Sequence, residues 1–182
     1  MSRAAVFFGT GYEEIEALTV VDILRRAGVE TSMVSVMGDR SVVGSHDVKV
    51  GMDALIDEVD FDKIDVIVLP GGMPGTKNLE ACETLMKQVD DFAAKDKIVA
   101  AICAAPSILG HRGLLRGKKA CSFPTFESHL EGAEVLQQPA VIDGNIITGR
   151  GMGTAIPFGL AVLEKLQGKE AAQKMAETIV FK

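Results

Sequence analysis

Short segments of strand character alternate with amphipathic segments along most of the chain. Each strand-like segment ends near a glycine or a cysteine, and helical spacing of apolar positions resumes soon afterwards. The segments that predict strands are residues 6–8, 31–37, 64–69 and 98–102. The segments that predict helices are residues 13–26, 79–94, 104–110, 154–166 and 169–178. This alternation predicts an α/β fold, a three-layer α/β/α sandwich whose parallel sheet is covered on both faces.

Two hairpins add antiparallel pairing to this plan. Residues 41–43 and 48–50 are short apolar segments that are joined through a polar tetrapeptide containing Gly44. Residues 140–142 and 145–148 flank Asp-Gly, a dipeptide that suits a type I′ turn. Residues 120–123 are expected to add one more short strand. The sheet is therefore predicted to be mainly, and not wholly, parallel.

Length and composition agree with a single domain over residues 1–182. A chain of 182 residues with 47% hydrophobic residues and a mean hydropathy of +0.23 can bury a sizeable core. The sequence contains no internal repeat, low-complexity stretch or linker that would divide it. We therefore expect one core and one domain.

Charge and targeting features narrow the possible partners. A formal net charge of −6 argues against general nucleic-acid binding. No apolar run is long enough to span a bilayer, and the apolar stretch near the N-terminus is too short for a secretory signal. Three cysteines, an odd and sparse set, are typical of a reducing compartment. We expect a soluble cytoplasmic protein without a membrane partner.

Cys103 is the strongest candidate for chemistry. It directly follows the apolar run at 98–102 and precedes Ala-Ala-Pro, so a strand is expected to end and a helix to begin there. A thiol at such a turn lies at the sheet edge, where the N–H groups of the helix favour its ionised form. A thiolate is a nucleophile, but free cysteine is also among the most buried residue types. Position alone leaves both readings open.

Two other strand ends are expected to meet this cysteine, because the carboxyl ends of parallel strands share one crevice. One leads into Gly71 and Gly72, whose amides either form an oxyanion pocket or make only a tight turn. The other leads to Glu13, Glu14 and Glu16. We interpret Glu13 and Glu14 as a solvated helix start. Glu16 is either solvated as well, or a carboxylic acid that donates a hydrogen bond to the sulfur.

The histidines offer no clear base for the cysteine. His111 ends the predicted cysteine helix and is expected to cap it, and His129 lies in a polar stretch that is interpreted as solvent-facing. The spacings of cysteine and histidine fit no zinc pattern, so no metal site is expected. Cys82 and Cys121 are assigned to packing or to the surface.

Three segments together resemble a known family. They are Glu-Glu-Ile-Glu at 13–16, Val-Leu-Pro-Gly-Gly at 68–72 and Ala-Ala-Ile-Cys-Ala-Ala-Pro at 100–106. In order, and over essentially the whole chain, the pattern resembles the ThiJ/PfpI superfamily, and within it the DJ-1/YajL-like branch. The resemblance implies a flavodoxin-like sandwich and a homodimer that packs partly through the first helix.

The same resemblance implies roles for individual residues. Cys103 would be reactive, Glu16 would be its protonated partner, and amides near Gly71, Gly72 and Ala104 would form an oxyanion-type pocket. No cofactor is implied. The implied activity acts on small dicarbonyls without glutathione, as a glyoxalase, or on their early adducts with proteins and nucleotides, as a deglycase. The implied alternative is a redox-sensing or chaperone-like protein whose cysteine is oxidised with little turnover.

Departures from the branch pattern bear on the mechanism. Phe123 stands where other members have a histidine near the cysteine, so a histidine base is not expected there. His46 stands where an arginine is expected, which weakens an anion or substrate contact shared with Arg26. Met152 replaces a proline. Ala104 stands where the protease branch has a histidine, so peptidase activity is not expected.

Overall fold

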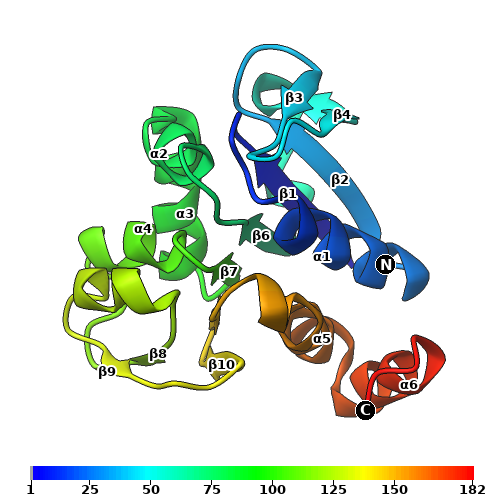
Figure 1. Cartoon of the computed structure of the whole chain (residues 1–182), viewed down its shortest axis with the longest axis vertical. Helices are drawn as coiled ribbons and strands as arrows, with labels where there is room; N and C mark the ends of the chain where they lie inside the picture. Colours follow the sequence, from blue (N-terminus) through cyan, green and yellow to red (C-terminus); the bar gives the residue numbers. More distant parts are fainter. Residues whose placement is uncertain (1) are drawn as a thin grey trace.

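A seven-stranded sheet forms the centre of the computed structural model, which describes residues 2–182 (Figure 1). Its strands are β1 (Arg3–Phe8), β2 (Glu30–Ser35), β5 (Ala54–Leu55), β6 (Val66–Leu69), β7 (Ile98–Ile102), β10 (Ala140–Asp143) and β11 (Ile146–Gly149). They lie in the order β10-β11-β7-β6-β1-β2-β5. Only the β10–β11 pair is antiparallel in this sheet, and its other pairs are parallel. The predicted mainly parallel sheet is confirmed.

Helices cover both faces of the sheet (Figure 1). One layer consists of α1 (Glu14–Arg26), α5 (Ala155–Gln167) and α6 (Lys169–Thr178). The other consists of α2 (Gly75–Glu80), α3 (Glu83–Ala94) and α4 (Pro106–His111). Short 3₁₀ turns are η1 (Ile56–Glu58), η2 (Phe61–Lys63), η3 (Pro124–His129) and η4 (Met152–Thr154). The arrangement is the predicted three-layer sandwich.

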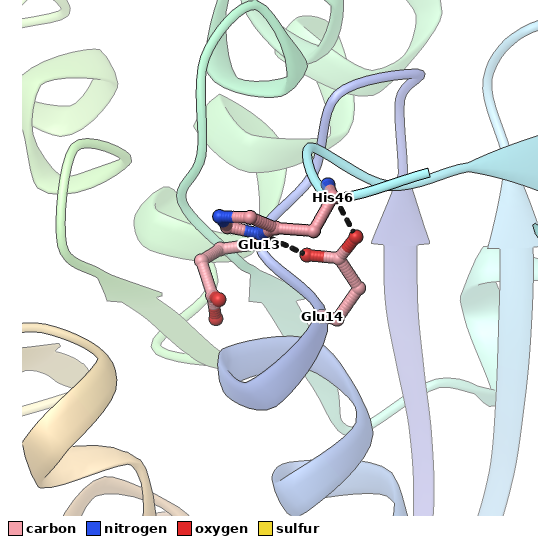
Figure 2. A group of neighbouring side chains, drawn as sticks. All are labelled: Glu13, Glu14 and His46. Carbon is pink, nitrogen blue, oxygen red and sulfur yellow. Dashed lines mark hydrogen bonds and ion pairs between the residues drawn. The ribbon is translucent and has the colours of Figure 1, made fainter. Parts of the chain in front are cut away.

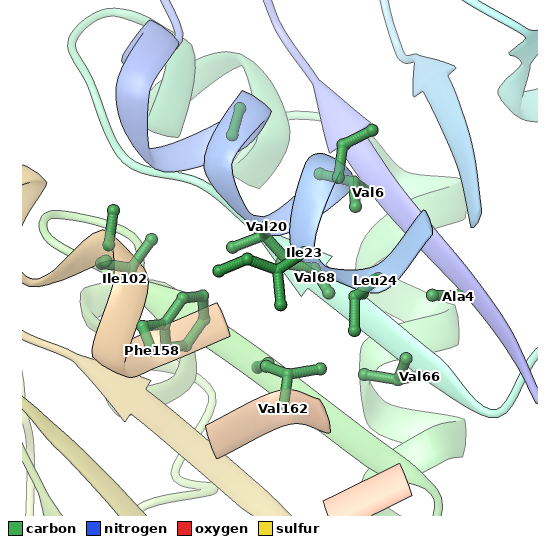
Figure 3. Packing of buried hydrophobic residues seen from close by; sticks show 14 of the residues in the cluster. Ala4, Val6, Val20, Ile23, Leu24, Val66, Val68, Ile102, Phe158 and Val162 are labelled. Carbon is green, nitrogen blue, oxygen red and sulfur yellow. The ribbon is translucent and has the colours of Figure 1, made fainter. Parts of the chain in front are cut away.

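Alternating side chains of the central strands build two separate cores. In β6, Val66 and Val68 pack toward α1 and α5 (Figure 3), whereas Ile67 and Leu69 pack toward α3 and α4. Because successive side chains of a strand point to opposite faces, a strand buried on both faces must be apolar at every position. This requirement explains the uninterrupted apolar runs in the sequence.

Two predicted elements differ from the structure. The helix predicted over residues 79–94 is divided into α2 and α3, because Cys82 adopts an extended backbone and begins the second helix as its N-cap. The strand predicted over residues 120–123 is shorter. It is β8 (Lys119–Ala120), which pairs with β9 (Glu134–Val135) outside the main sheet.

The remaining expectations concern the first hairpin and the membrane. The predicted hairpin forms as β3 (Ser41–Val43) and β4 (Lys49–Gly51), which pair antiparallel outside the main sheet. Within residues 2–182, every helix is too short or too polar to cross a bilayer.

Candidate active site

Cys103 occupies a strained turn at the carboxyl end of β7. Its φ of +66° lies in the left-handed region, which costs free energy for a residue with a side chain. The backbone is held on both sides: the Cys103 N–H donates to the Gly149 carbonyl at 3.0 Å, and its carbonyl accepts from the Phe123 N–H at 2.9 Å. Such a turn presents a side chain above the sheet edge, as a nucleophile elbow does.

Glu16 lies beside the thiol in the first turn of α1. Its side chain is fully buried, and its carboxyl group and the Cys103 thiol are hydrogen-bond partners. The Oε2 atom accepts from the Gly71 N–H at 2.9 Å, while Oε1 has no hydrogen-bond partner. Glu13 is the N-cap of the helix and accepts from the Glu16 N–H at 2.9 Å, which holds the start of α1 in place. Of the two readings left open for Glu16, the structure supports the partner of the sulfur.

Gly71 lies against both Cys103 and Glu16. A Cβ atom at this position would lie 2.6 Å from the Cβ of Cys103 and 2.7 Å from Oε2 of Glu16. Only glycine therefore allows the loop after β6 to approach both side chains so closely. Backbone hydrogen bonding from the next amide, that of Gly72, and from the amide of Ala104 lowers the pKa of the thiol. Of the three amides that were expected to form an oxyanion pocket, those of Gly72 and Ala104 therefore act on the thiol, whereas that of Gly71 donates to Glu16.

Burial determines the proton affinity of this pair. It raises the pKa of Glu16 to about 7, and hydrogen bonds from Cys103 and the Gly71 amide only partly oppose it. Burial, followed by the Glu16 charge, raises the pKa of the Cys103 thiol, and the amides of Ala104 and Gly72 oppose the rise. Two coupled acids lose their protons in two steps. The pair therefore releases one proton near neutral pH and holds the other.

This result corrects the expectation that a helix N-terminus lowers the pKa of the thiol. The helix α4 begins only at Pro106 and has six residues, so its N–H groups add little at Cys103. The groups that lower the pKa of the thiol are the amides of Ala104 and Gly72, whereas the charge of the buried Glu16 carboxyl raises it.

The raised pKa of Glu16 predicts a loss of stability as the pH rises. Its pKa is about 7 when folded and 4.5 in a model peptide, so the stabilising proton is bound below pH 4.5 and is lost as pH passes through 7. The free energy of unfolding is expected to fall by about 3 kcal/mol between pH 5 and 8. Urea unfolding at several pH values measures this change. A Glu16→Gln variant serves as the matched control, and an equal slope in that variant would rule out Glu16 as the cause.

Glu14 is buried, which corrects its interpretation as a solvated residue (Figure 2). Its Oε1 accepts from the His46 N–H at 2.7 Å, and its Oε2 accepts from the Ser45 hydroxyl at 3.1 Å and lies 3.0 Å from His46 Nδ1. Burial opposes ionisation, yet these hydrogen bonds hold the pKa of Glu14 at about 2. The contacts fasten the β3–β4 loop to the start of α1.

Donor atoms of Glu13, Glu14 and His46 lie within 4.8 Å of one another, a spacing compatible with a metal ion. Both oxygens of Glu14 already accept hydrogen bonds, and Glu13 caps α1. Figure 2 shows the Glu13 carboxylate apart from the bonded Glu14–His46 pair. The cluster is a hydrogen-bonded clamp of the helix start.

The proposed contacts at Arg26 and His46 are not brought together. Arg26 lies in the last turn of α1 and pairs with Asp22 at 2.6 Å. It is ten residues beyond Glu16, or about 15 Å along the helix. His46 is engaged by Glu14 instead. A single chain therefore does not form the anion site that the sequence left possible.

The two other departures lie near the surface. The Phe123 side chain is 44% exposed, and its ring faces Gly151, so no titratable group stands at this position. Met152 is 50% exposed at the start of η4. The close approach of Gly71 to Cys103 and Glu16 and the hydrogen bond of Ser45 to Glu14 could not be predicted from the sequence, because both depend on contacts between distant segments.

Comparison with known proteins places these features in context. The sequence model of the DJ-1/PfpI family matches residues 2–165. Protein dj-1beta of Drosophila melanogaster is 36% identical over 183 residues, which cover 99% of this chain and 98% of that protein. The structure titled Toxoplasma gondii DJ-1, oxidized, superposes with a TM-score of 0.95 at 35% identity and covers 100% of this chain and 99% of its own.

Two further relatives differ in length or in name. Protein DJ-1 homolog B of Arabidopsis thaliana is 37% identical over 168 residues, which cover 92% of this chain but 38% of the plant protein. The chain thus spans less than half of that relative. A Caenorhabditis elegans protein named glutathione-independent glyoxalase DJR-1.2 is 27% identical over 168 residues, which cover 92% of this chain and 89% of that protein.

Proposed function

Because the chain belongs to the DJ-1/PfpI family, we propose that it is a cysteine-dependent enzyme that acts on small reactive dicarbonyls or on their early adducts. The observation that carries the proposal is the strained Cys103 in hydrogen-bond contact with the buried carboxyl of Glu16. A relative named as a glutathione-independent glyoxalase supports the same substrate class.

The proton shared by the pair suits it to nucleophilic attack. The amides of Gly72 and Ala104 lower the pKa of the thiol, and the Gly71 amide donates to the Glu16 carboxyl at 2.9 Å. Amide donors stabilise the charged form of the group that they face. The proton that the pair retains resides mainly on the thiol, whose pKa is the higher of the two. The reactive form is the tautomer in which this proton has moved to Glu16, where Oε1 has no hydrogen-bond partner, and the charge is on Cys103. The pair then offers a thiolate and an acid side by side.

Methylglyoxal illustrates the reaction. The Cys103 sulfur bonds to the aldehyde carbon, and the carbonyl oxygen takes the Glu16 proton, which yields a hemithioacetal. Glu16 then moves a proton from C1 to the C2 oxygen, and next one from the C1 hydroxyl to C2, which leaves a lactoyl thioester. Water cleaves the thioester to lactate and restores the thiol. The net reaction adds one water to methylglyoxal and needs no outside oxidant.

The direct test is lactate formation from methylglyoxal by the purified protein in buffer without glutathione. We expect turnover that stops when Cys103 is alkylated beforehand. A parallel assay with the hemithioacetal of methylglyoxal and a free thiol separates the two implied activities, because a deglycase would consume the adduct faster than the free dicarbonyl. The proposal would be overturned if neither reaction ran faster with the protein than without it.

A second function is favoured by the same half-buried thiol. Peroxide can convert the thiolate to a sulfinate, a step in which sulfur gains two oxygen atoms and two peroxides become water. The Glu16 acid would then donate a hydrogen bond to a sulfinate oxygen. A solved DJ-1 structure described as oxidized supports this chemistry for the family.

Mild peroxide is therefore expected to add two oxygen atoms at Cys103 and none at Cys121, which is fully buried. Peptide mass spectrometry after limited treatment measures both sites. Prevention of aggregation of an unfolded client protein, assayed before and after oxidation, tests the chaperone-like role. Equal modification of both cysteines would contradict selective oxidation at the elbow.

We also propose a homodimer that buries the outer face of α1. A groove of about 770 Å³ runs along this face. Four apolar side chains of the groove are exposed at the surface: Ile15, Val48, Ile156 and Val180. An exposed apolar patch of this kind is typical of a protein–protein interface.

An Ile15→Asp substitution is expected to convert the dimer to a monomer, because it places a charge on the covered apolar face. Sedimentation should then give the mass of one chain, 19.3 kDa, in place of twice that value. The control is Ile142→Asp, which changes an isoleucine on β10 that is also exposed but lies outside the groove. Loss of the dimer in both variants would contradict this interface.

A further inference from the structure

Three polar side chains meet on the surface. Each is the last residue of an element that follows a loop or residue of the candidate active site. Glu80 is the last residue of α2, His111 of α4 and His129 of η3. The sequence predicted that His111 caps its own helix, but its ring instead contacts residues of two other elements. Its Nδ1 lies 2.7 Å from Glu80 Oε1, and its Nε2 lies 3.1 Å from His129 Nδ1.

The carboxylate determines which nitrogen of His111 is free. A carboxylate accepts hydrogen bonds only, so the Nδ1 of His111 must carry the proton that faces Glu80. A neutral His111 therefore presents a lone pair at Nε2, directed at the second imidazole. The two ring nitrogens lie 3.1 Å apart and form one hydrogen bond, in which His129 Nδ1 donates its proton to His111 Nε2. A metal ion bound between these two nitrogens would have to displace that proton.

We propose that His111 and His129 together bind a late first-row divalent transition-metal ion, with Zn²⁺ as the probe. At the usual metal–nitrogen distance of about 2.0–2.1 Å, nitrogens 3.1 Å apart subtend roughly 100° at the ion. This value lies between the octahedral and tetrahedral angles. A neutral His129 can move its proton to Nε2 and leave Nδ1 free for the metal. Both histidines are exposed, so their rings can rotate to aim both lone pairs at one point.

The surroundings favour such an ion. A carboxylate that accepts from the second nitrogen of a ligating histidine is a recurrent outer contact of metal sites, because it orients the ring and increases its basicity. Glu80 is in this position. Imidazole pairs suit zinc, copper and nickel, whereas Mg²⁺ and Ca²⁺ need oxygen ligands. The neighbouring Arg112 is paired with Asp90 through its Nε at 2.6 Å, so its charge is balanced locally.

The place of the site in the fold suggests what binding does. The helix α2 follows the loop of Gly71 and Gly72, α4 follows Cys103, and η3 follows Phe123. Each element thus begins at the candidate active site and ends at this cluster. An ion bound by the two histidines, one of them oriented by Glu80, would brace α2, α4 and η3 against one another. Metal binding is therefore expected to raise the melting temperature.

The test uses the full-length Cys103→Ala protein, because the thiol of the wild type is a competing zinc ligand. Zn²⁺ is titrated by calorimetry while the ring nitrogens of the histidines are followed by ¹⁵N NMR. We expect His111 Nε2 and His129 Nδ1 to shift together at one equivalent, with a rise in melting temperature. His111→Ala or His129→Ala should weaken binding at least about tenfold, and Glu80→Gln should weaken it by about tenfold or more.

The matched control is His46→Ala, which removes the histidine of the Glu13–Glu14 cluster and should leave zinc binding unchanged. Since the histidine variants alter exposed side chains, their melting temperatures without zinc verify that they fold. Zinc that shifts His46, or that leaves the nitrogens of His111 and His129 unchanged, would overturn the proposal. The pair would then be a hydrogen bond only.

Discussion

Replacing Cys103 with alanine is expected to abolish methylglyoxal turnover, with a loss of at least about 1000-fold. The route to lactate passes through a bond between the sulfur and the aldehyde carbon, and alanine has no atom that can form it. The side chain is half-buried next to Gly71 and Glu16, so the shorter residue leaves the backbone undisturbed. Initial rates of lactate formation, with wild type and variant at equal concentration, measure the effect.

The control for this experiment is Cys82→Ala, which removes a half-buried thiol at the N-cap of α3 and should keep wild-type turnover. Glu16→Gln separates the acid from the nucleophile. Glutamine fills the same space and can donate a hydrogen bond to the sulfur, but it cannot shuttle a proton. We expect this variant to keep alkylation of Cys103 by iodoacetamide and to lose turnover about 100-fold or more. Full turnover by pure Cys103→Ala protein would contradict this mechanism.

Gly71→Ala is expected to have the second-largest effect, on both activity and stability. The added Cβ would lie within 2.9 Å of three atoms: Cβ of Cys103, Oε2 of Glu16 and the Ile102 carbonyl oxygen. The backbone carbonyl cannot give way, so the loop must shift and the two reactive groups must separate. A displacement of about 1 Å at a reacting group costs about 100-fold in rate. Overpacking at a buried site costs about 1–3 kcal/mol of stability.

Urea unfolding and lactate formation together measure this prediction. The matched control is Gly51→Ala in β4, where an added Cβ meets no atom within 4 Å and the backbone angle needs no glycine. If Gly71→Ala retained the activity and stability of the control, the loop would be free to move, and the requirement for glycine at this close approach would be wrong. A variant that lost stability but kept turnover would separate packing from chemistry.

The main elements could be predicted because their causes are local. The strand over residues 98–102 and the helix over residues 169–178 have the bounds that the sequence predicts, since apolar runs and helical spacing are properties of neighbouring residues. The division of residues 79–94 into two helices could not be predicted in this way. No glycine or proline marks the break at Cys82.

The sequence predicted which residues lie near the candidate site, but it did not predict their proton affinities. Cys103 follows a strand and Glu16 lies in the first turn of a helix, so the topology of a parallel sheet was enough to place both at one edge. The direction in which the pKa of the thiol shifts could not be predicted. It depends on burial and on a carboxyl that comes from a segment 87 residues away in the sequence.

The sequence alone determined the layers of this protein, the order of its strands and helices along the chain and the place of the candidate cysteine at the end of a strand. These follow from periodicity and from the position of a residue at the end of an element. Tertiary structure alone decided that Glu14 is buried, that Arg26 pairs with Asp22, and that His111 meets His129 eighteen residues away. The physical reason is that proton affinity and metal-binding geometry depend on distances of a few ångströms between side chains. Residues far apart in the sequence set those distances only when the chain packs.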